Sequence, residues 1–414
     1  MKVVVLGAGV VGVAAAYFLA RAGAQVTVIE RAGSVAEGTS YANGGQLSAQ
    51  SAGPWANPEA IPIALGSLLR EDGPFKLRLR ADPALAAWVF RFLRNCTPAR
   101  ARRNRARLLA LGLYSRRMLS DLLADIPLDF DHRTRGILEL YRGSRAFERE
   151  KRAAAEVSPA AARVLSASEC IELEPALAER RFAIAGGIHY PQDASGDARR
   201  FTEGLAAALE RRGVRFEFNR RLRALRASGT AIAAALTDDG ACEADAYVLA
   251  LGCDSAAIVR PLGLRLPIYP VKGYSVTLPV EGASGVPEIS IGDEARKIVI
   301  ARLGARLRAA GTAELAGYDL TLNPVRARAV LSGLLDLFPR AGDPACAEFW
   351  AGLRPMTPDG APVLGATAYR NLFLDTGHGT LGWTLACGSG RLIADLATEH
   401  RPEIPLAEYG LERF

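Results

Sequence analysis

Residues 3–12 read Val-Val-Val-Leu-Gly-Ala-Gly-Val-Val-Gly, and this stretch decides the fold class of the 414-residue chain. Its first four residues are an apolar run that predicts a buried parallel strand, and residues 10–21 predict a helix. Residues 25–30 predict a second strand, which completes a β-α-β unit. The three glycines at positions 7, 9 and 12 lie between the first strand and the helix, with the spacing of a dinucleotide-binding loop.

Each position of this loop has a physical role in binding a pyrophosphate. The first glycine permits a tight turn, the second lets the backbone approach the ligand, and the third lets the helix pack on the strand. Amides at the start of the helix then face the phosphates. Glu30 ends the second strand, where a carboxylate accepts hydrogen bonds from a ribose and repels the extra phosphate of NADP. An ordinary glycine-rich turn would explain the glycines but not the acidic residue at the end of the second strand. The motif therefore predicts that a dinucleotide, NAD or FAD, is bound by Gly7, Gly9, Val10, Val11, Gly12 and Glu30.

The composition is that of a folded globular protein, because half of the residues are hydrophobic and 23% are charged. The length favours two domains. The formal charge of +7 comes almost entirely from an excess of arginine. Such a charge fits a nucleic-acid or membrane partner, but we favour the alternative that arginine is abundant because of genomic base composition.

Six scattered cysteines without a Cys-x-x-Cys pair predict a reducing, cytoplasmic compartment, and four dispersed histidines predict no metal site. The apolar N-terminal stretch resembles a signal peptide or a membrane span. However, it contains the glycine motif and is ended by Arg21 before about 20 residues have passed, so we expect no transmembrane segment.

Several further motifs carry a resemblance to a known family. The pattern from Val3 to Glu30, followed by Thr39-Ser40-x-x-Asn43-Gly44-Gly45-Gln46, resembles the D-amino-acid oxidase superfamily of flavoproteins. Residues 352–360 and 371–390 resemble bacterial D-amino-acid dehydrogenases of the small-subunit type, as do residues 269–275 and 94–96. The resemblance runs nearly from end to end.

The resemblance implies FAD as the cofactor and an α/β fold, with a Rossmann-type FAD-binding domain and a mixed-sheet α+β substrate domain. Because the nucleotide motif and the late glycine-rich turn at 377–382 lie far apart in sequence, the FAD-binding domain is expected to be discontinuous, over 1–53, 190–258 and 350–402. The substrate domain then takes 54–189 and 259–349, with a helical insert at about 54–125. Besides the glycine motif and Glu30, the implied FAD-binding residues are Val3, Arg31, Ser40, Asn43, Gly44, Gly45, Gln46, Gly252, Gly377, Gly379, Thr380, Leu381, Gly382, Trp383 and Thr384.

The implied reaction transfers a hydride from the α carbon of a D-amino acid, such as D-alanine, to the flavin. The imine product would then hydrolyse to a 2-oxo acid and ammonia. Arg354 is expected to bind the substrate carboxylate, since a guanidinium offers two parallel N–H donors. Tyr274 is expected either to present its hydroxyl to the substrate or to pack in a strand. His378 is expected to contact flavin or substrate, with a purely structural contact as the alternative.

The natural electron acceptor implied by the family is a quinone or another component of the respiratory chain. Residues 84–95 place Leu85, Trp88, Val89 and Phe92 on one helical face beside a run of arginines. Such a helix either docks peripherally on the cytoplasmic face of the inner membrane or packs in the core.

Other functions share the same motifs. A D-proline or hydroxyproline dehydrogenase and an oxygen-using amine oxidase are alternatives within the superfamily. An RNA-associated flavoprotein would need an added basic module that the sequence lacks, so we expect no nucleic-acid partner.

Overall fold

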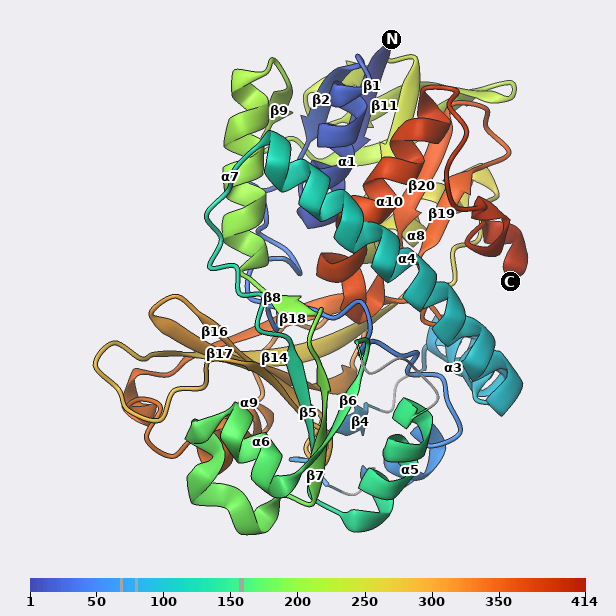
Figure 1. Cartoon of the computed structure of the whole chain (residues 1–414). Coiled ribbons are helices and arrows are strands. Elements are labelled where there is room, and N and C mark those ends of the chain that lie inside the picture. Colours follow the sequence, from blue (N-terminus) through green and yellow to red (C-terminus); the bar gives the residue numbers. More distant parts are fainter. Residues whose placement is uncertain (68–69, 79–80, 156–159) are drawn as a thin grey trace.

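Two β-sheets, between which the chain crosses repeatedly, organise the computed structural model (Figure 1). It describes residues 1–67, 70–78, 81–155 and 160–414. Both termini lie on the side of the smaller sheet, which we call the nucleotide half, and the larger sheet forms the opposite half. The predicted combination of a Rossmann-type unit with a mixed sheet is confirmed.

The smaller sheet has six strands in the order β19-β20-β13-β1-β2-β9. All neighbours are parallel except β19 and β20. Its buried, Val-rich strands and covering helices are typical of a parallel sheet. The bounds are β1 (Lys2–Leu6), β2 (Gln25–Ile29), β9 (Arg215–Glu217), β13 (Ala246–Leu249), β19 (Val363–Ala366) and β20 (Leu372–Thr376).

The longer helices of the nucleotide half are α1 (Val10–Arg21), α4 (Pro98–Asp125), α7 (Ala198–Arg211) and α10 (Gly382–Ala397). The helix α4 belongs to the insert that the sequence assigned to the substrate domain. Its apolar face, which includes Leu108, Leu111 and Leu122, lies instead in the same core cluster as α1 and α10. The Ser115 hydroxyl accepts a hydrogen bond of 2.9 Å from the amide of Gly388 in α10. The insert therefore divides between the two halves.

The larger sheet has nine strands, in the order β18-β14-β17-β16-β15-β5-β7-β6 with β4 beside β17. Its strands are β4 (Phe75–Leu77), β5 (Ile137–Tyr141), β6 (Arg163–Ser166), β7 (Gly186–Tyr190), β14 (Tyr269–Pro279), β15 (Ser290–Asp293), β16 (Ile298–Leu303), β17 (Arg306–Leu315) and β18 (Glu348–Met356). The strand β18 extends past the expected domain boundary at residue 350 and pairs with β14. The residues 350–356 therefore belong to the larger sheet, not to the nucleotide half.

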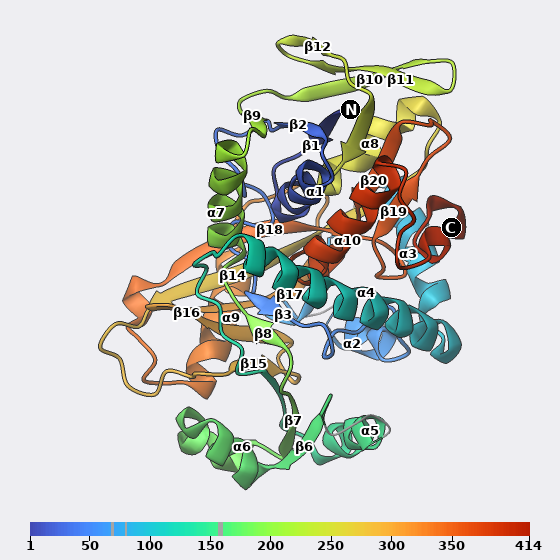
Figure 2. The same cartoon turned by 45° about the horizontal axis from the view of Figure 1, so that its top comes forward.

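One face of the larger sheet is covered by α9 (Pro324–Leu337), whose side chains share a core with Tyr274, Val276 and Leu278 of β14. The opposite face turns toward the nucleotide half (Figure 1). Smaller elements complete the fold: β3 (Gln46–Leu47), β8 (Ala194–Ser195), β10 (Leu222–Ser228), β11 (Ala231–Thr237), β12 (Gly240–Cys242), α2 (Ala60–Ser67), α3 (Pro83–Asn95), α5 (Ser144–Ala155), α6 (Ala167–Leu173) and α8 (Ser255–Val259). Figure 2 shows β10, β11 and β12 as a separate sheet at the outer edge of the nucleotide half.

A carboxyl group in the larger sheet has an unusual environment. Burial and the nearby charge of Glu294 raise the pKa of Glu139 to about 8. The Tyr141 hydroxyl donates to Glu139 at 3.2 Å. The folded protein therefore retains a proton on Glu139 at pH values where the unfolded chain has lost it.

This retained proton predicts a pH-dependent stability. Because the unfolded state ionises near pH 4.5 and the folded state near pH 8, the Glu139 contribution disfavours folding increasingly as pH rises through that window. We expect Glu139→Gln to flatten the fall of the melting temperature between pH 5 and pH 8. Thermal unfolding by circular dichroism across this window measures the effect. An unchanged slope in the variant would contradict the assignment.

Candidate active site at the junction of the two sheets

The glycine loop lies at the carboxyl ends of the parallel strands. Gly7 has a φ of 108°, and its amide donates to the carbonyl of Ile29 at 2.9 Å. A methyl group at Gly12 would lie 1.9 Å from the carbonyl oxygen of Gly7. The residue that precedes α1, Gly9, has no side chain with which to cap the helix. The turn is thus closed tightly by backbone contacts, and the start of α1, where backbone amides lack partners within the helix, fits an anion.

Side chains from two other segments complete this edge. The Glu30 carboxylate accepts hydrogen bonds from the amides of Ala8 at 2.8 Å and Ala32 at 2.9 Å, so it lies directly over the glycine loop. The Ser40 hydroxyl accepts from the amide of Val10 at 3.1 Å. This acid and the glycine loop fit the ribose and pyrophosphate of a dinucleotide.

The segment after Ser40 continues from this edge onto the larger sheet. Asn43 accepts from the amide of Gly45 at 3.0 Å. A Cβ at Gly44 would lie 2.5 Å from the side chain of Val299 in β16. Gln46 donates to the hydroxyl of Ser290 in β15 at 3.0 Å. The predicted residues 43–46 therefore line the junction between the halves.

The late glycine-rich turn reaches the same junction. Gly252, Gly377 and Gly379 all have positive φ angles, of 55°, 74° and 57°. The Thr376 hydroxyl donates to the Gly252 carbonyl at 3.2 Å, which joins the ends of β13 and β20. A bridge between Met356 and His378 then places the end of β18 against this turn. Two predicted FAD-binding segments and the strand that carries Arg354 are thus brought together.

The Arg354 guanidinium lies across β14 on the face that turns toward the nucleotide half. It occupies the space beside Gly273, where an added Cβ would be 2.3 Å from its central carbon. It donates to the carbonyls of Thr312 at 2.8 Å and Gly311 at 3.4 Å. Burial lowers the pKa of Arg354 to about 10. Within the described ranges no carboxylate pairs with it, so its charge lacks an anionic partner.

Aromatic residues that the sequence did not single out lie near this cation or on the same face of its strand. Trp350 bends along β18 so that a Cβ at Gly352 would lie 1.9 Å from its indole. The Trp350 ring stacks on Tyr41 with centroids 6.2 Å apart, and Trp55 lies 5.5 Å from the Arg354 guanidinium. Tyr41 stands inside the Ser40–Gly45 motif, and the spacing Trp350-x-Gly352-x-Arg354 puts all three on one face of a strand. This alternation in the sequence could have indicated that Trp350 shares a face with Arg354.

Two predicted catalytic residues do not face Arg354. Tyr274 lies on the α9 side of β14, where its hydroxyl donates to Glu314 at 2.7 Å, so the expectation of a substrate contact is corrected. The reason is the strand period: Gly273 faces the junction, and its neighbour points away. His378 is buried, and its Nε2 lies 3.0 Å from the Ser389 hydroxyl and 3.3 Å from Asp375. These contacts match its structural alternative.

Other predicted FAD-binding residues have structural contacts. The Trp383 indole donates to the Gly196 carbonyl at 3.1 Å and packs against Phe201, so its side chain belongs to the core. Val3 is a core residue four positions before Gly7. Arg31 pairs with Asp254 at 2.8 Å. The remaining predicted residues at this turn are Thr380, which is exposed, Leu381, which is buried, Gly382, which starts α10, and Thr384, whose hydroxyl accepts from the amide of Ser48 at 3.0 Å.

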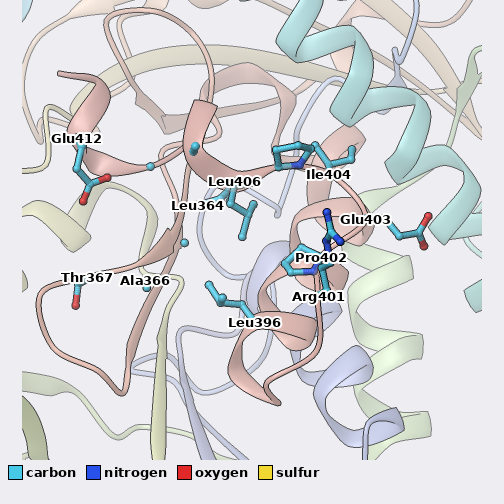
Figure 3. Close-up of a pocket in the computed structure, with 14 residues that line it drawn as sticks. Leu364, Ala366, Thr367, Leu396, Arg401, Pro402, Glu403, Ile404, Leu406 and Glu412 are labelled. Atoms are coloured by element: carbon cyan, nitrogen blue, oxygen red, sulfur yellow. The ribbon is translucent and has the colours of Figure 1, made fainter.

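A cavity of about 850 Å³ lies elsewhere, between β19 and the C-terminal segment (Figure 3). Leu364, Leu396, Leu406 and Arg401 line it, and none of the predicted site residues does. One of its acids, Glu403, pairs with Arg117. This cavity offers no arrangement suited to the expected chemistry, so the candidate site is the junction at Arg354.

Comparisons with known proteins agree with this arrangement. A family model described as FAD dependent oxidoreductase matches residues 2–396. The chain is 52% identical to a D-amino acid dehydrogenase of Paramagnetospirillum magneticum, with 100% of this chain and 99% of the relative covered. It is 45% identical to a D-amino acid dehydrogenase of Bradyrhizobium diazoefficiens, over 100% and 99% of the two chains. Among solved structures, glycine oxidase from Geobacillus kaustophilus has a TM-score of 0.78 at 24% identity, covering 100% of this chain and 99% of its own.

Proposed function

Because this chain belongs to the family of FAD-dependent oxidoreductases, we propose that it oxidises D-amino acids to 2-oxo acids and ammonia, as a dehydrogenase. The observation that carries the substrate assignment is the unpaired Arg354 guanidinium at the junction. Leaving such a cation half-buried without an anion is unfavourable, and a substrate carboxylate would supply the missing charge. D-Alanine and similar neutral amino acids are the proposed substrates.

The cofactor, when bound, supplies the acceptor for the hydride that leaves the α carbon. The glycine loop at Gly7–Gly12 and the Glu30 carboxylate would hold its pyrophosphate and ribose. Arg354 would bind the substrate carboxylate through two parallel donors, which fixes the α carbon. Trp55, which lies beside the guanidinium, and Trp350, on the same face of β18, would help to exclude water from it. If the amine binds neutral, no protein base is needed, and water converts the released imine to the 2-oxo acid and ammonia.

Anaerobic titration of the yellow holoenzyme with D- and L-alanine tests this proposal. We expect D-alanine to bleach the flavin absorbance and to yield pyruvate, while L-alanine leaves the spectrum unchanged. Failure of D-alanine and of D-proline to bleach the flavin would defeat the proposal. A faster response to D-proline would favour the D-proline dehydrogenase alternative, and peroxide formed under air would indicate an oxidase.

We also propose that α3 and the start of α4 dock on an anionic membrane. A quinone in that membrane would then accept the electrons from the enzyme. Leu85 and Trp88 of α3 pack inward, and the Trp88 indole donates to Met356 at 2.8 Å. Phe90 and Leu93 on the outer face are 63% and 48% exposed. Nearby arginines are exposed and have no ion pair within the described part of the chain; they are Arg94, Arg100, Arg102 and Arg103. No described helix has the length and hydropathy needed to cross a bilayer.

This surface predicts a measurable membrane affinity. Replacing both Phe90 and Leu93 with serine removes two apolar anchors, and we expect about a tenfold loss of binding to vesicles with anionic lipid. Co-sedimentation at low salt measures it. Val325→Ser, which changes an exposed apolar residue on α9, serves as the matched control and should bind as the wild type does. Equal binding by all three proteins would contradict the assignment of this surface.

A further inference from the structure

We propose that Tyr274 and Glu314 are positioning residues. From the α9 side of the larger sheet they hold a β-bulge in place, and carbonyls of this bulge accept hydrogen bonds from Arg354. The inference rests on the proposed function, in which Arg354 binds the substrate carboxylate. It gives Tyr274 a role that acts through the backbone rather than through substrate contact.

The bulge lies in β17 beside Gly273. Tyr274 pairs with Gly311 and Lys272 pairs with Glu314, so two residues of β17, Thr312 and Ala313, oppose the single residue Gly273. Thr312 has a φ of 57°. A β-branched residue rarely adopts this left-handed conformation, which the surrounding structure must therefore impose.

The bulge directs backbone acceptors toward the substrate side. In a regular antiparallel strand, successive carbonyls point in opposite directions along the sheet. Here the carbonyls of both Gly311 and Thr312 accept from the two terminal nitrogens of Arg354, at 3.4 Å and 2.8 Å. Because the glycine beside the bulge has no side chain, the guanidinium can lie across β14 to reach them. The orientation of Arg354 thus depends on the shape of this bulge.

A buried polar cluster fixes the two residues that flank the bulge. Glu314 is 1% exposed and accepts hydrogen bonds from the Tyr274 hydroxyl at 2.7 Å and from Arg78 at 2.8 Å. Lys272 and Arg326 lie 3.8 Å and 3.4 Å from the same carboxylate. Although burial opposes its ionisation, the hydrogen bonds from Tyr274 and Arg78 hold the pKa of Glu314 below its usual range.

The far side of the cluster is anchored as well. The Lys272 ammonium donates to Asp319 and to the Thr321 carbonyl, both at 3.1 Å. The flanking pair Lys272 and Glu314 is therefore tied to the chain that follows β17, and Tyr274 is tied to Glu314 across the bulge. A charged cluster of this kind contributes little net stability compared with apolar packing, so its use directly behind the substrate arginine indicates positioning.

Binding of propionate, a carboxylate without an oxidisable amine, tests the proposal in the FAD-loaded enzyme. The dissociation constant is read from the change in flavin absorbance, with the melting temperature and the FAD content measured in parallel. We expect Tyr274→Phe to weaken propionate binding about tenfold, with FAD content unchanged. The matched control is Tyr409→Phe, since the Tyr409 hydroxyl is equally buried and donates to the Arg107 carbonyl at 2.8 Å. It should bind propionate as the wild type does.

Deletion of Thr312 is the second variant, and it decides the question if Tyr274→Phe does not fold. Removing the extra residue leaves both flanking pairs in register and abolishes the bulge, so FAD should be retained while propionate binding is lost. The positioning role is overturned if Tyr274→Phe or the deletion binds propionate as the wild type does, or if Tyr409→Phe weakens binding equally. If the wild type itself does not bind propionate in competition with D-alanine, the proposed function fails instead.

Discussion

Replacing Arg354 with methionine should lower kcat/KM for D-alanine by about 10²–10³-fold, which corresponds to about 3–4 kcal/mol. Methionine keeps much of the length and the apolar stem but removes the donors that would pair with the carboxylate. Arg354→Lys keeps a positive charge, but one ammonium cannot make two parallel hydrogen bonds, so we expect an intermediate loss. Steady-state assays with an artificial electron acceptor measure both variants.

The FAD content separates this effect from misfolding. Arg354 does not touch the glycine loop, so the methionine variant should remain yellow. Arg302→Met is the matched control, because Arg302 is a partly buried arginine of the same sheet that pairs with Glu288. It should retain wild-type kcat/KM. A methionine variant of Arg354 that keeps full activity would exclude this residue as the carboxylate ligand.

The sequence predicted best those elements that depend on residues close together in the chain. The strand, turn and helix of residues 2–21 follow from an apolar run and three glycines, and the structure has them where the pattern predicts. Such elements depend on contacts between residues close in the chain, which the order of residue types reports directly.

The direction of side chains was harder to predict. For Tyr274 the sequence left both a substrate contact and packing in a strand open, and it did not show that the neighbouring Gly273 is the residue beside Arg354. The bulge at Thr312 that shapes this site arises from pairing between distant strands, which no local pattern reveals. Trp383 likewise stands in a family motif, yet its ring packs against Phe201. A motif therefore located the region without separating residues that touch a ligand from residues that support it.

Replacing Gly12 with valine should give a colourless protein with at least about a 100-fold loss of FAD affinity. The first added carbon would lie 1.9 Å from the carbonyl oxygen of Gly7, so either α1 or the loop must move. The loop cannot yield easily, because Gly7 has a φ of 108° and is hydrogen-bonded to Ile29. Displacing α1 would carry the amides at its start away from the pyrophosphate that they are proposed to bind.

Two measurements distinguish this effect from a general loss of stability. Flavin absorbance of the purified variant, followed by calorimetric titration of the apoprotein with FAD, reports cofactor affinity, while circular dichroism reports folding. Gly143→Ala is the control, since an added Cβ there meets no atom within 4 Å. The control should bind FAD fully. If a folded Gly12→Val variant still takes up FAD with wild-type affinity, the close contact between α1 and the loop is not what holds the cofactor. The FAD site would then have to be assigned to a different part of the junction.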